Sequence, residues 1–258
     1  MNTENIEKMS GHWLLARIGK KVLRPGGLML TEKMLTMLHI TPDDDVVELA
    51  PGLGYTARLT LKNNPKSYTG IDAEQRVTDH LNKEFRQTSA KFQSGNAAHT
   101  SLPEQSADKV YGEALLSMHA DHRKSEIIKE ASRILKPKGY YAIHELALAP
   151  DTLDDDVKLH IQKDLASAIK VNARPLTVSE WTHLLEKEGF TIKKIETAPM
   201  HLLEPQRIIS DEGFRGFLKI VGNLMIQPDI RSRVLRMRKT FKKYEDCFCA
   251  VSILAQKI

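Results

Sequence analysis

The chain has 258 residues, of which 41% are apolar, a size and composition that suit one α/β domain with added segments. It has 38 Lys and Arg residues and 33 Asp and Glu residues, which give a formal net charge of +5. This basic excess is not concentrated enough to indicate a dedicated nucleic-acid-binding protein. The polar start at 1–8 lacks the apolar core of a signal peptide, and no apolar run approaches the roughly 20 residues of a membrane span. The two cysteines, Cys247 and Cys249, are too close in sequence for a secreted disulfide framework. We therefore expect a cytoplasmic protein.

Residues 1–40 are a predicted helical lead-in that precedes any strand. Trp13, Leu14 and Ile18 fit one helical face, and the sequence Arg-Pro-Gly-Gly at 24–27 breaks this run. We expect Thr31 to cap a second helix, because its hydroxyl can accept a hydrogen bond from a free N–H group of the first turn.

The stretch 46–57 organises the rest of the chain. An apolar, β-branched start ending in an acid is followed by Gly52-Leu53-Gly54 and then by residues that can open a helix. This order predicts a strand, a tight turn and a helix N-terminus. Glycine lets the main chain bend sharply and approach a ligand closely, while the free N–H groups of the helix face that ligand. The pattern is typical of a nucleotide-cofactor turn.

A second predicted strand, 67–72, ends in Asp72, eighteen residues beyond Gly54. Doubly wound folds place a carboxylate at this position against the two hydroxyls of a ribose. Asp72 is therefore the leading candidate for cofactor binding. The alternative is that it caps the helix or turn that follows.

From there the predicted elements alternate. Helices are expected at 73–85 and 123–135, and strands at 90–93, 107–111 and 140–144. Such alternation predicts a doubly wound, mostly parallel sheet.

Beyond residue 145 the pattern changes. We expect a helical excursion at 153–171, a helix at 177–188 capped by Thr177 or Ser179, and strands at 192–195 and 250–255. Residues 205–244 are mainly helical, with a break near Gly213. The final stretch, 230–244, combines an apolar stripe with basic side chains, Arg233 and Arg236 among them, that we interpret as a solvated face. The whole is one α/β domain, 1–258, with a seven-stranded sheet and lid-like helical insertions at about 147–175 and 205–244. We expect the helical lead-in and these two insertions to form a lid over the cofactor pocket.

Two cofactor classes fit this turn, because Gly52 to Ala57 also satisfies the G-x-G-x-x-[G/A] pattern of dinucleotide-binding folds. However, Glu48-x-Ala50-x-Gly52-x-Gly54 resembles the E/D-x-G-x-G-x-G motif of class I S-adenosylmethionine-dependent methyltransferases. Further matches are Asp72, Asn96 before Ala97, and the turn Leu-Lys-Pro-Lys-Gly at 135–139. The overall pattern is similar to the ubiquinone/menaquinone-biosynthesis branch.

The resemblance implies a Rossmann-like methyltransferase fold and S-adenosylmethionine as cofactor. It also implies a set of cofactor-binding residues, namely Glu48, Ala50, Pro51, Gly52, Gly54, Asp72, Asn96, Ala97 and Glu113. The chain departs from the family pattern at Ala50, where we expect a sterically mild change, at Leu53, and at Asn96 in place of aspartate. An Asn carbonyl still accepts a hydrogen bond from the adenine amine, although a weaker one.

A methyl acceptor that must lose a proton needs a base, and candidates follow the fourth and fifth strands, where doubly wound folds have their ligand crevice. These candidates are Glu113, His119, His122, His144 and Glu145, of which His119, Glu113 and His144 are the predicted catalytic residues. His119 suits the role because an unperturbed histidine has a pKa of about 6.5. His119, Asp121 and His122 lack the i, i+4 helical spacing of metal ligands, so no metal is predicted.

We conclude that the sequence predicts a methyltransferase that acts on a small-molecule acceptor, whose identity and attacked atom remain open. Three alternatives belong to other classes: an NAD(P)-dependent oxidoreductase, a nucleic-acid methyltransferase using the basic helix, and a non-catalytic cofactor-binding module. Nucleic acid is disfavoured as a partner, no membrane span is expected, and the oligomeric state is open between a monomer and a homodimer.

Overall fold

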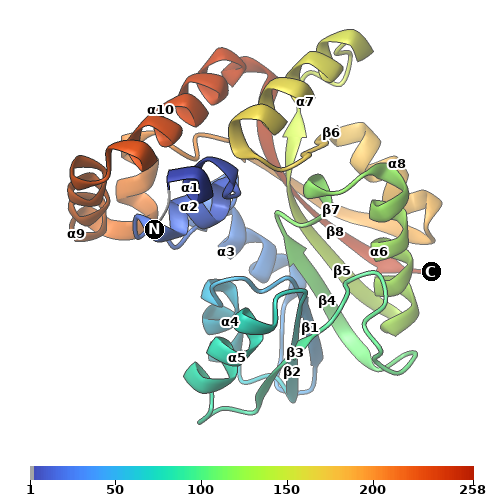
Figure 1. Ribbon diagram of the computed structural model, residues 1–258. Helices are drawn as coiled ribbons and strands as arrows, with labels where there is room; N and C mark the ends of the chain where they lie inside the picture. Colours follow the sequence, from blue (N-terminus) through green and yellow to red (C-terminus); the bar gives the residue numbers. More distant parts are fainter. Residues whose placement is uncertain (1–2) are drawn as a thin grey trace.

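The computed structural model describes residues 3–258, so that Met1 and Asn2 of the predicted lead-in lie outside it. A single mixed sheet crosses the molecule (Figure 1). Its strands are β1 (Asp45–Leu49), β2 (Ser67–Asp72), β3 (Ala90–Ser94), β4 (Ala107–Glu113), β5 (Leu135–Leu148), β6 (Leu176–Thr177), β7 (Phe190–Pro199) and β8 (Phe248–Lys257). Their order is β3-β2-β1-β4-β5-β8-β7, with β8 antiparallel to both neighbours. The predicted seven-stranded, mostly parallel sheet is confirmed, and the two-residue β6 is added beside β5.

Helices cover both faces of the sheet, as expected for parallel strands whose side chains are buried on both sides. One face carries α3 (Gly27–Leu38), α4 (Tyr55–Thr60) and α5 (Gln75–Glu84), which pack on Tyr68 and Phe92. The other face carries α6 (Asp121–Ile134) and α8 (Val178–Lys187), with Trp181 fully buried. Three short 3₁₀ turns complete these layers: η1 (Leu61–Asn63), η2 (Leu116–Met118) and η3 (Glu245–Cys247). This is a three-layer arrangement.

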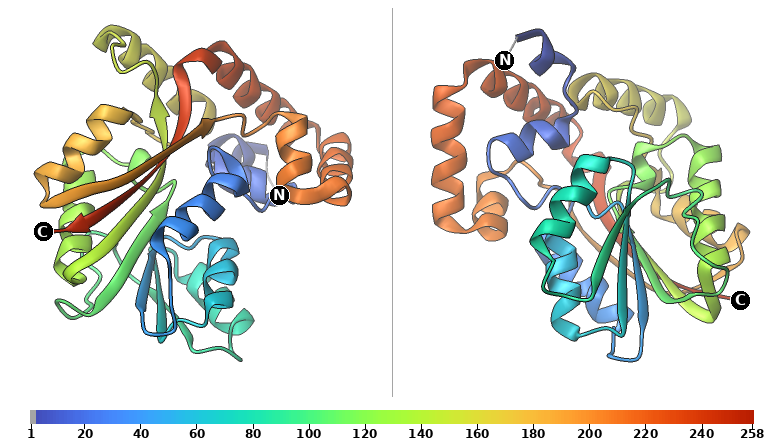
Figure 2. Two further views of the ribbon diagram at one scale, coloured as in Figure 1. Left: turned by 180° about the vertical axis from the view of Figure 1, so that it is seen from behind. Right: turned by 60° about the horizontal axis from the view of Figure 1, so that its bottom comes forward.

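A separate group of helices forms a cap beyond the sheet (Figures 1 and 2). It consists of α1 (Thr3–Lys8), α2 (Gly11–Arg17), α7 (Asp155–Ile169), α9 (Pro205–Ile226) and α10 (Pro228–Lys243). These helices share an apolar cluster that includes Leu14, Ile161, Ile220 and Met237. The lead-in and the two insertions therefore form one layer, although they are far apart in sequence. None of the helices in the described part of the chain is long and apolar enough to cross a membrane.

Two buried cations hold this cap together. Arg233 of α10 is only 1% exposed and donates to the carbonyls of Ile6 at 2.5 Å and Met9 at 2.8 Å, where α1 ends. The interpretation of the basic face of α10 as solvated is thus wrong for Arg233, because its guanidinium is buried against carbonyl groups at the C-terminal end of α1. Lys20, also buried, lies 3.5 Å from Asp211 of α9.

Local predictions differ from the structure at few points. Of the two predicted caps of α8, Thr177 is the one found, and it also forms a capping box with Glu180. Thr31 was wrongly predicted as a cap, because α3 begins four residues earlier at Gly27 and Thr31 lies buried inside the helix. There its hydroxyl donates to Glu113 at 2.6 Å. The break in α9 is at Gly213, whose φ of 72° is in the left-handed region.

Candidate active site

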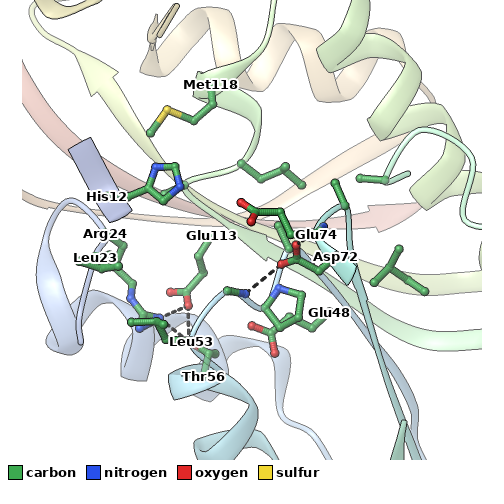
Figure 3. Close-up of a pocket in the computed structure, with 18 of the residues that line it drawn as sticks. His12, Leu23, Arg24, Glu48, Leu53, Thr56, Asp72, Glu74, Glu113 and Met118 are labelled. Carbon is green, nitrogen blue, oxygen red and sulfur yellow. Dashed lines mark hydrogen bonds and ion pairs between the residues drawn. The ribbon is translucent and has the colours of Figure 1, made fainter. Parts of the chain in front are cut away.

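A pocket of about 730 Å³ lies where β1, β2 and β4 end (Figure 3). Its size falls within the range of roughly 300–1,000 Å³ of ligand-binding pockets. Most of the sequence-predicted site residues line it, namely Glu48, Ala50, Pro51, Gly52, Asp72, Asn96, Ala97, Glu113 and His119. Gly54 and His144 do not line it, and neither does any residue of the insertions at 147–175 and 205–244. Among the described residues, the sheet edge and the lead-in line the pocket, and the role of the two insertions as a lid stays a prediction.

The two glycines of the turn after β1, Gly52 and Gly54, have different structural roles. A side chain at Gly52 would meet no atom within 4 Å, so this position borders open space in the pocket. At Gly54 a Cβ would lie 2.6 Å from Leu81 of α5, so this glycine allows the start of α4 to pack on α5. Ala50 has a φ of 58°, a left-handed conformation that costs a non-glycine residue roughly 1 kcal/mol, so its replacement of glycine is less mild than expected.

Asp72 presents its carboxylate to this turn. One oxygen accepts a hydrogen bond from the Gly52 N–H at 3.2 Å, and the other accepts from the Glu74 N–H at 3.0 Å. Burial raises the pKa of Asp72, and these two N–H donors oppose the rise. The N-cap of α5 is Glu74, so Asp72 does not cap that helix itself. Its carboxylate retains acceptor capacity toward the pocket, because each oxygen carries two lone pairs.

The lead-in helix α2 reaches the same edge. The indole N–H of Trp13 donates to Glu74 at 2.8 Å, and the Arg76 guanidinium lies 5.0 Å from the centre of the Trp13 ring. Sequence reasoning missed Trp13 as a site residue, because its position on an apolar helical face indicates only packing. In the structure this ring borders the pocket beside the predicted ribose position.

Asn96 begins a turn after β3. Its side-chain carbonyl accepts from the Ala98 N–H at 3.0 Å and from Arg123 at 2.5 Å. These bonds use both lone pairs of the carbonyl oxygen. An adenine amine would have to displace one of these donors, so the adenine-binding role of Asn96 stays a prediction.

Glu113 is at the centre of a buried polar cluster at the end of β4. Its carboxylate accepts hydrogen bonds from Arg24, Thr31, Thr56 and His144. Burial alone would raise the pKa of Glu113, but the Arg24 guanidinium and the His144 ring together hold it below its ordinary value. A carboxylate so stabilised is a weak base, and the cluster instead ties the lead-in to the sheet.

His144 is fully buried behind Glu113, on β5. Its two ring nitrogens lie 2.7 Å from a Glu113 oxygen and 2.6 Å from the Pro25 carbonyl oxygen. Both ring nitrogens are thus engaged by protein atoms. The prediction of His144 as a base is therefore corrected, because its buried ring does not line the pocket and cannot reach an acceptor there.

Glu48, the acid at the end of β1, faces two buried phenols. Tyr68 and Tyr111 both donate to one of its oxygens, Tyr111 at 2.9 Å. Burial raises the pKa of Glu48 to about 7, although these hydrogen bonds oppose the rise. Glu48 thus borders the pocket while its carboxylate is part of the core.

Two histidines remain free to act. His119 follows the 3₁₀ turn η2 and lines the pocket; burial lowers its pKa, with help from Arg123 and Lys124. His12 of α2, which sequence reasoning missed, lines it from the cap side, near Met118 (Figure 3). Burial also lowers the pKa of His12. Both rings are therefore neutral at physiological pH and can accept a proton.

Glu145 holds the segment that carries His119. This fully buried carboxylate accepts hydrogen bonds from the N–H groups of Leu115, Leu116 and Ser117 at 2.7–3.0 Å. Three N–H donors on one carboxylate fix the path of the chain, so Glu145 positions the loop without reaching the pocket. Among the residues described, no three His, Cys, Asp or Glu side chains converge on a possible metal position.

Comparison with known proteins decides the class of this site. A family model described as a methyltransferase domain matches residues 46–139, the span of the glycine turn, Asp72, Asn96 and Glu113. A Haemophilus influenzae protein named only as uncharacterized is 31% identical over 251 residues, covering 96% of this chain and 98% of its own. The chain belongs to the class I S-adenosylmethionine-dependent methyltransferases.

Other methyltransferases are more distant. An O-methyltransferase of Dictyostelium discoideum is 24% identical over 185 residues, which is 70% of this chain but only 47% of that protein. A Haemonchus contortus phosphoethanolamine N-methyltransferase, solved with phosphomonomethylethanolamine and S-adenosylhomocysteine, superimposes with a TM-score of 0.71 at 18% identity. That match covers 96% of this chain and 57% of the other, and shows the fold alone. The ubiquinone/menaquinone branch is not confirmed by these relatives.

The residues of the pocket fit S-adenosylmethionine, the methyl donor of this family. Gly52 leaves room for close approach, and Asp72 offers an acceptor where a ribose diol is expected. When bound, the cofactor supplies a sulfonium methyl group that is already activated toward nucleophiles. The protein must then orient the acceptor and, where needed, remove its proton.

Proposed function

We propose that this methyltransferase transfers the methyl group to a small-molecule acceptor. The observation that carries the proposal is that the lead-in borders the pocket: His12, Trp13 and Arg24 line it together with the residues at the strand ends. The Trp13–Glu74 and Arg24–Glu113 contacts tie the lead-in to the strands. A pocket bordered by two parts of the chain in this way suits a compact acceptor better than a polymer.

Within this site the protein contributes mainly orientation. Holding two reactants in the productive geometry can supply about 7–11 kcal/mol of the barrier reduction. For an acceptor that must lose a proton, a neutral histidine supplies the base. His119, predicted from the sequence, and His12 both line the pocket and are the two candidates.

The basic helix α10 supports a small acceptor over a nucleic acid. Four of its seven cations are already engaged: Arg233 is buried, and Arg236, Arg238 and Lys243 are ion-paired with Glu7, Glu204 and Asp164. Charges that are already paired offer few contacts for phosphates.

Two measurements test the proposal. Calorimetry should show binding of S-adenosylmethionine and S-adenosylhomocysteine but not of NAD. Incubation of the protein with methyl-labelled cofactor and a metabolite extract should then transfer the label to a molecule of low mass.

Each alternative predicts another result. NAD binding without S-adenosylmethionine binding would indicate an oxidoreductase. Tight cofactor binding with no labelled product would indicate a non-catalytic module. Label found in RNA or DNA, with binding that weakens steeply as salt rises, would indicate a nucleic-acid methyltransferase.

A further inference from the structure

A second, smaller cavity adjoins the pocket on the cap side. It has a volume of about 60 Å³ and is lined by apolar side chains, among them Leu15, Leu165, Ile169, Met200, Met237 and Phe241. These residues come from α2, α7, α10 and the segment before α9. We call this cavity the apolar chamber. The two insertions line no part of the larger pocket, but they contribute walls to the chamber.

The chamber and the pocket share part of their lining. His12, Leu23, Ala114 and Met118 border both cavities. Figure 3 shows the His12 ring and the Met118 side chain next to each other at the upper side of the pocket. A molecule in the pocket could thus extend one end past His12 and Met118 into the chamber.

The chemistry of the chamber selects what can enter it. Among the described residues that line it, only His12 and Ser117 carry a polar side chain with a strong hydrogen-bonding group. The Ser117 hydroxyl already donates to Glu145 at 2.6 Å. A polar group placed deep in the chamber would lose its hydrogen bonds to water without replacement, so the chamber favours an apolar group.

The volume of the chamber bounds the size of that group. A cavity needs about 10–15 Å³ by this measure to hold one water molecule, so 60 Å³ accommodates about four to six non-hydrogen atoms. A branched alkyl end or a single ring has this size.

The surroundings of His12 suit proton transfer at the entrance of the chamber. Burial lowers the pKa of His12; the nearby Glu74 carboxylate opposes this effect and the Arg76 guanidinium adds to it. The Ser10 hydroxyl lies 3.4 Å from the Nε2 atom of His12. His119, in contrast, lines only the larger pocket and not the chamber, and it lies close to Arg123 and Lys124.

We propose that the acceptor has an apolar end that occupies the apolar chamber and a weakly acidic O–H or N–H group that lies against His12, which takes its proton. This inference rests on the proposed function. The acceptor atom forms a bond to the methyl carbon as the methyl–sulfur bond breaks, and that electron pair stays on sulfur. The proton passes to the imidazole of His12, so the products are the methylated acceptor, S-adenosylhomocysteine and a protonated histidine. No further reactant is needed.

The first test uses the label-transfer assay with metabolite extract. We expect the labelled product to partition into organic solvent. His12→Gln should lower the single-turnover rate about 100-fold or more, the usual effect of losing a general base, while its affinity for S-adenosylhomocysteine stays within about threefold of the wild type. In the wild type the single-turnover rate should rise with pH, with a midpoint below about pH 6.5. This rise should be missing from the pH profile of His12→Gln. His119→Gln should lower the single-turnover rate by a smaller factor than His12→Gln.

The second test fills the chamber. Val171 lines the chamber but not the larger pocket, and Ser167 lies exposed on α7 as a matched control position. Val171→Phe should reduce label transfer at least about tenfold at unchanged S-adenosylhomocysteine affinity, and Ser167→Phe should not, because only the former places atoms where the acceptor lies.

These tests separate the two proposals. If the wild type binds no S-adenosylhomocysteine or labels nothing, the proposed function itself fails. If the wild type labels a product that stays in water, or Val171→Phe transfers label as fast as Ser167→Phe, only the chamber assignment fails. A larger loss in His119→Gln than in His12→Gln would overturn the role of His12. Melting temperature and S-adenosylhomocysteine affinity, measured for every variant, identify any that is misfolded.

Discussion

The Trp13 indole N–H donates a hydrogen bond of 2.8 Å to the Glu74 carboxylate, two residues beyond Asp72. This bond joins helix α2 of the lead-in to the end of strand β2, across 61 positions of sequence. The Trp13 ring therefore borders the pocket near Asp72, the predicted ribose-binding residue. The lead-in is thus part of the pocket lining as well as of the cap.

Replacement of Trp13 by Phe removes a hydrogen bond within the protein, so it should lower the free energy of unfolding by about 1 kcal/mol. It should also weaken S-adenosylhomocysteine binding, because the lead-in is then held less firmly beside the pocket. Calorimetry measures the change. Trp13 and the buried Trp181 are the two tryptophans, so the fluorescence response to the ligand should also disappear in Trp13→Phe. Wild-type affinity in this variant would show that the lead-in does not close on the ligand.

Replacement of Asp72 by Ala should lower S-adenosylhomocysteine affinity by roughly one to three orders of magnitude, since it removes charge-assisted hydrogen bonds to the ribose. It should also cost about 1 kcal/mol of unfolding free energy, because the N–H groups of Gly52 and Glu74 lose their acceptor. Asp72→Asn keeps one acceptor oxygen, so it should lose less ligand affinity and less unfolding free energy than Asp72→Ala. A lowered melting temperature with unchanged affinity in Asp72→Ala would sink the ribose assignment.

The two glycines of the turn should respond differently to substitution. Both have positive φ, so a side chain strains either, but only at Gly54 would it collide with Leu81. A folded Gly54→Val variant that merely loses cofactor, as the motif alone suggests, is therefore not expected. We expect Gly54→Val to unfold at a much lower temperature than Gly52→Val, and Gly52→Val to lose cofactor affinity while still folded. Thermal melts with calorimetry distinguish the two, and equal stabilities would contradict the packing role of Gly54.

Stability should fall as pH rises through neutrality because of Glu48. Burial raises its pKa from 4.5 to about 7, so the folded state binds this proton more tightly than the unfolded state. The resulting stabilisation is complete below about pH 4.5 and is lost as pH rises through about 7, by at most about 3 kcal/mol. Glu48→Gln should remove this decline between pH 5 and about 8 in denaturant titrations. Parallel pH profiles of variant and wild type would refute the assignment.

Two arginines of α10 form a matched pair. Arg233 is buried against carbonyls of α1, and its replacement by Met should cost about 3 kcal/mol or more of unfolding free energy by leaving buried acceptors unpaired. Arg236 is 57% exposed and pairs with Glu7 at the surface, so Arg236→Ala should change stability, cofactor affinity and activity by only a small factor. A large loss of activity in Arg236→Ala would instead point to an anionic acceptor.

The sequence by itself determined the elements whose signals are local. The β1 turn, the strand that ends at Asp72 and the capping box at Thr177 each depend on residues within a few positions of one another. The alternation of strands and helices was sufficient to predict a parallel sheet, because a helix between two strands returns the chain to the end of the sheet where the first strand began. The motif residues could be predicted to converge for the same reason, since the ends of parallel strands meet at one edge.

Only the tertiary structure decided which side chains complete the site. His12 and Trp13 come from helix α2 and Arg24 from the loop after it, and no local pattern marks them as site residues. Trp13 meets Glu74 and Arg24 meets Glu113 because the lead-in folds over the sheet edge. The same packing buried His144 between Glu113 and Pro25, which removed it from the pocket. Residue type predicts what a side chain can do, but desolvation and partners, both set by long-range contacts, decide what it does.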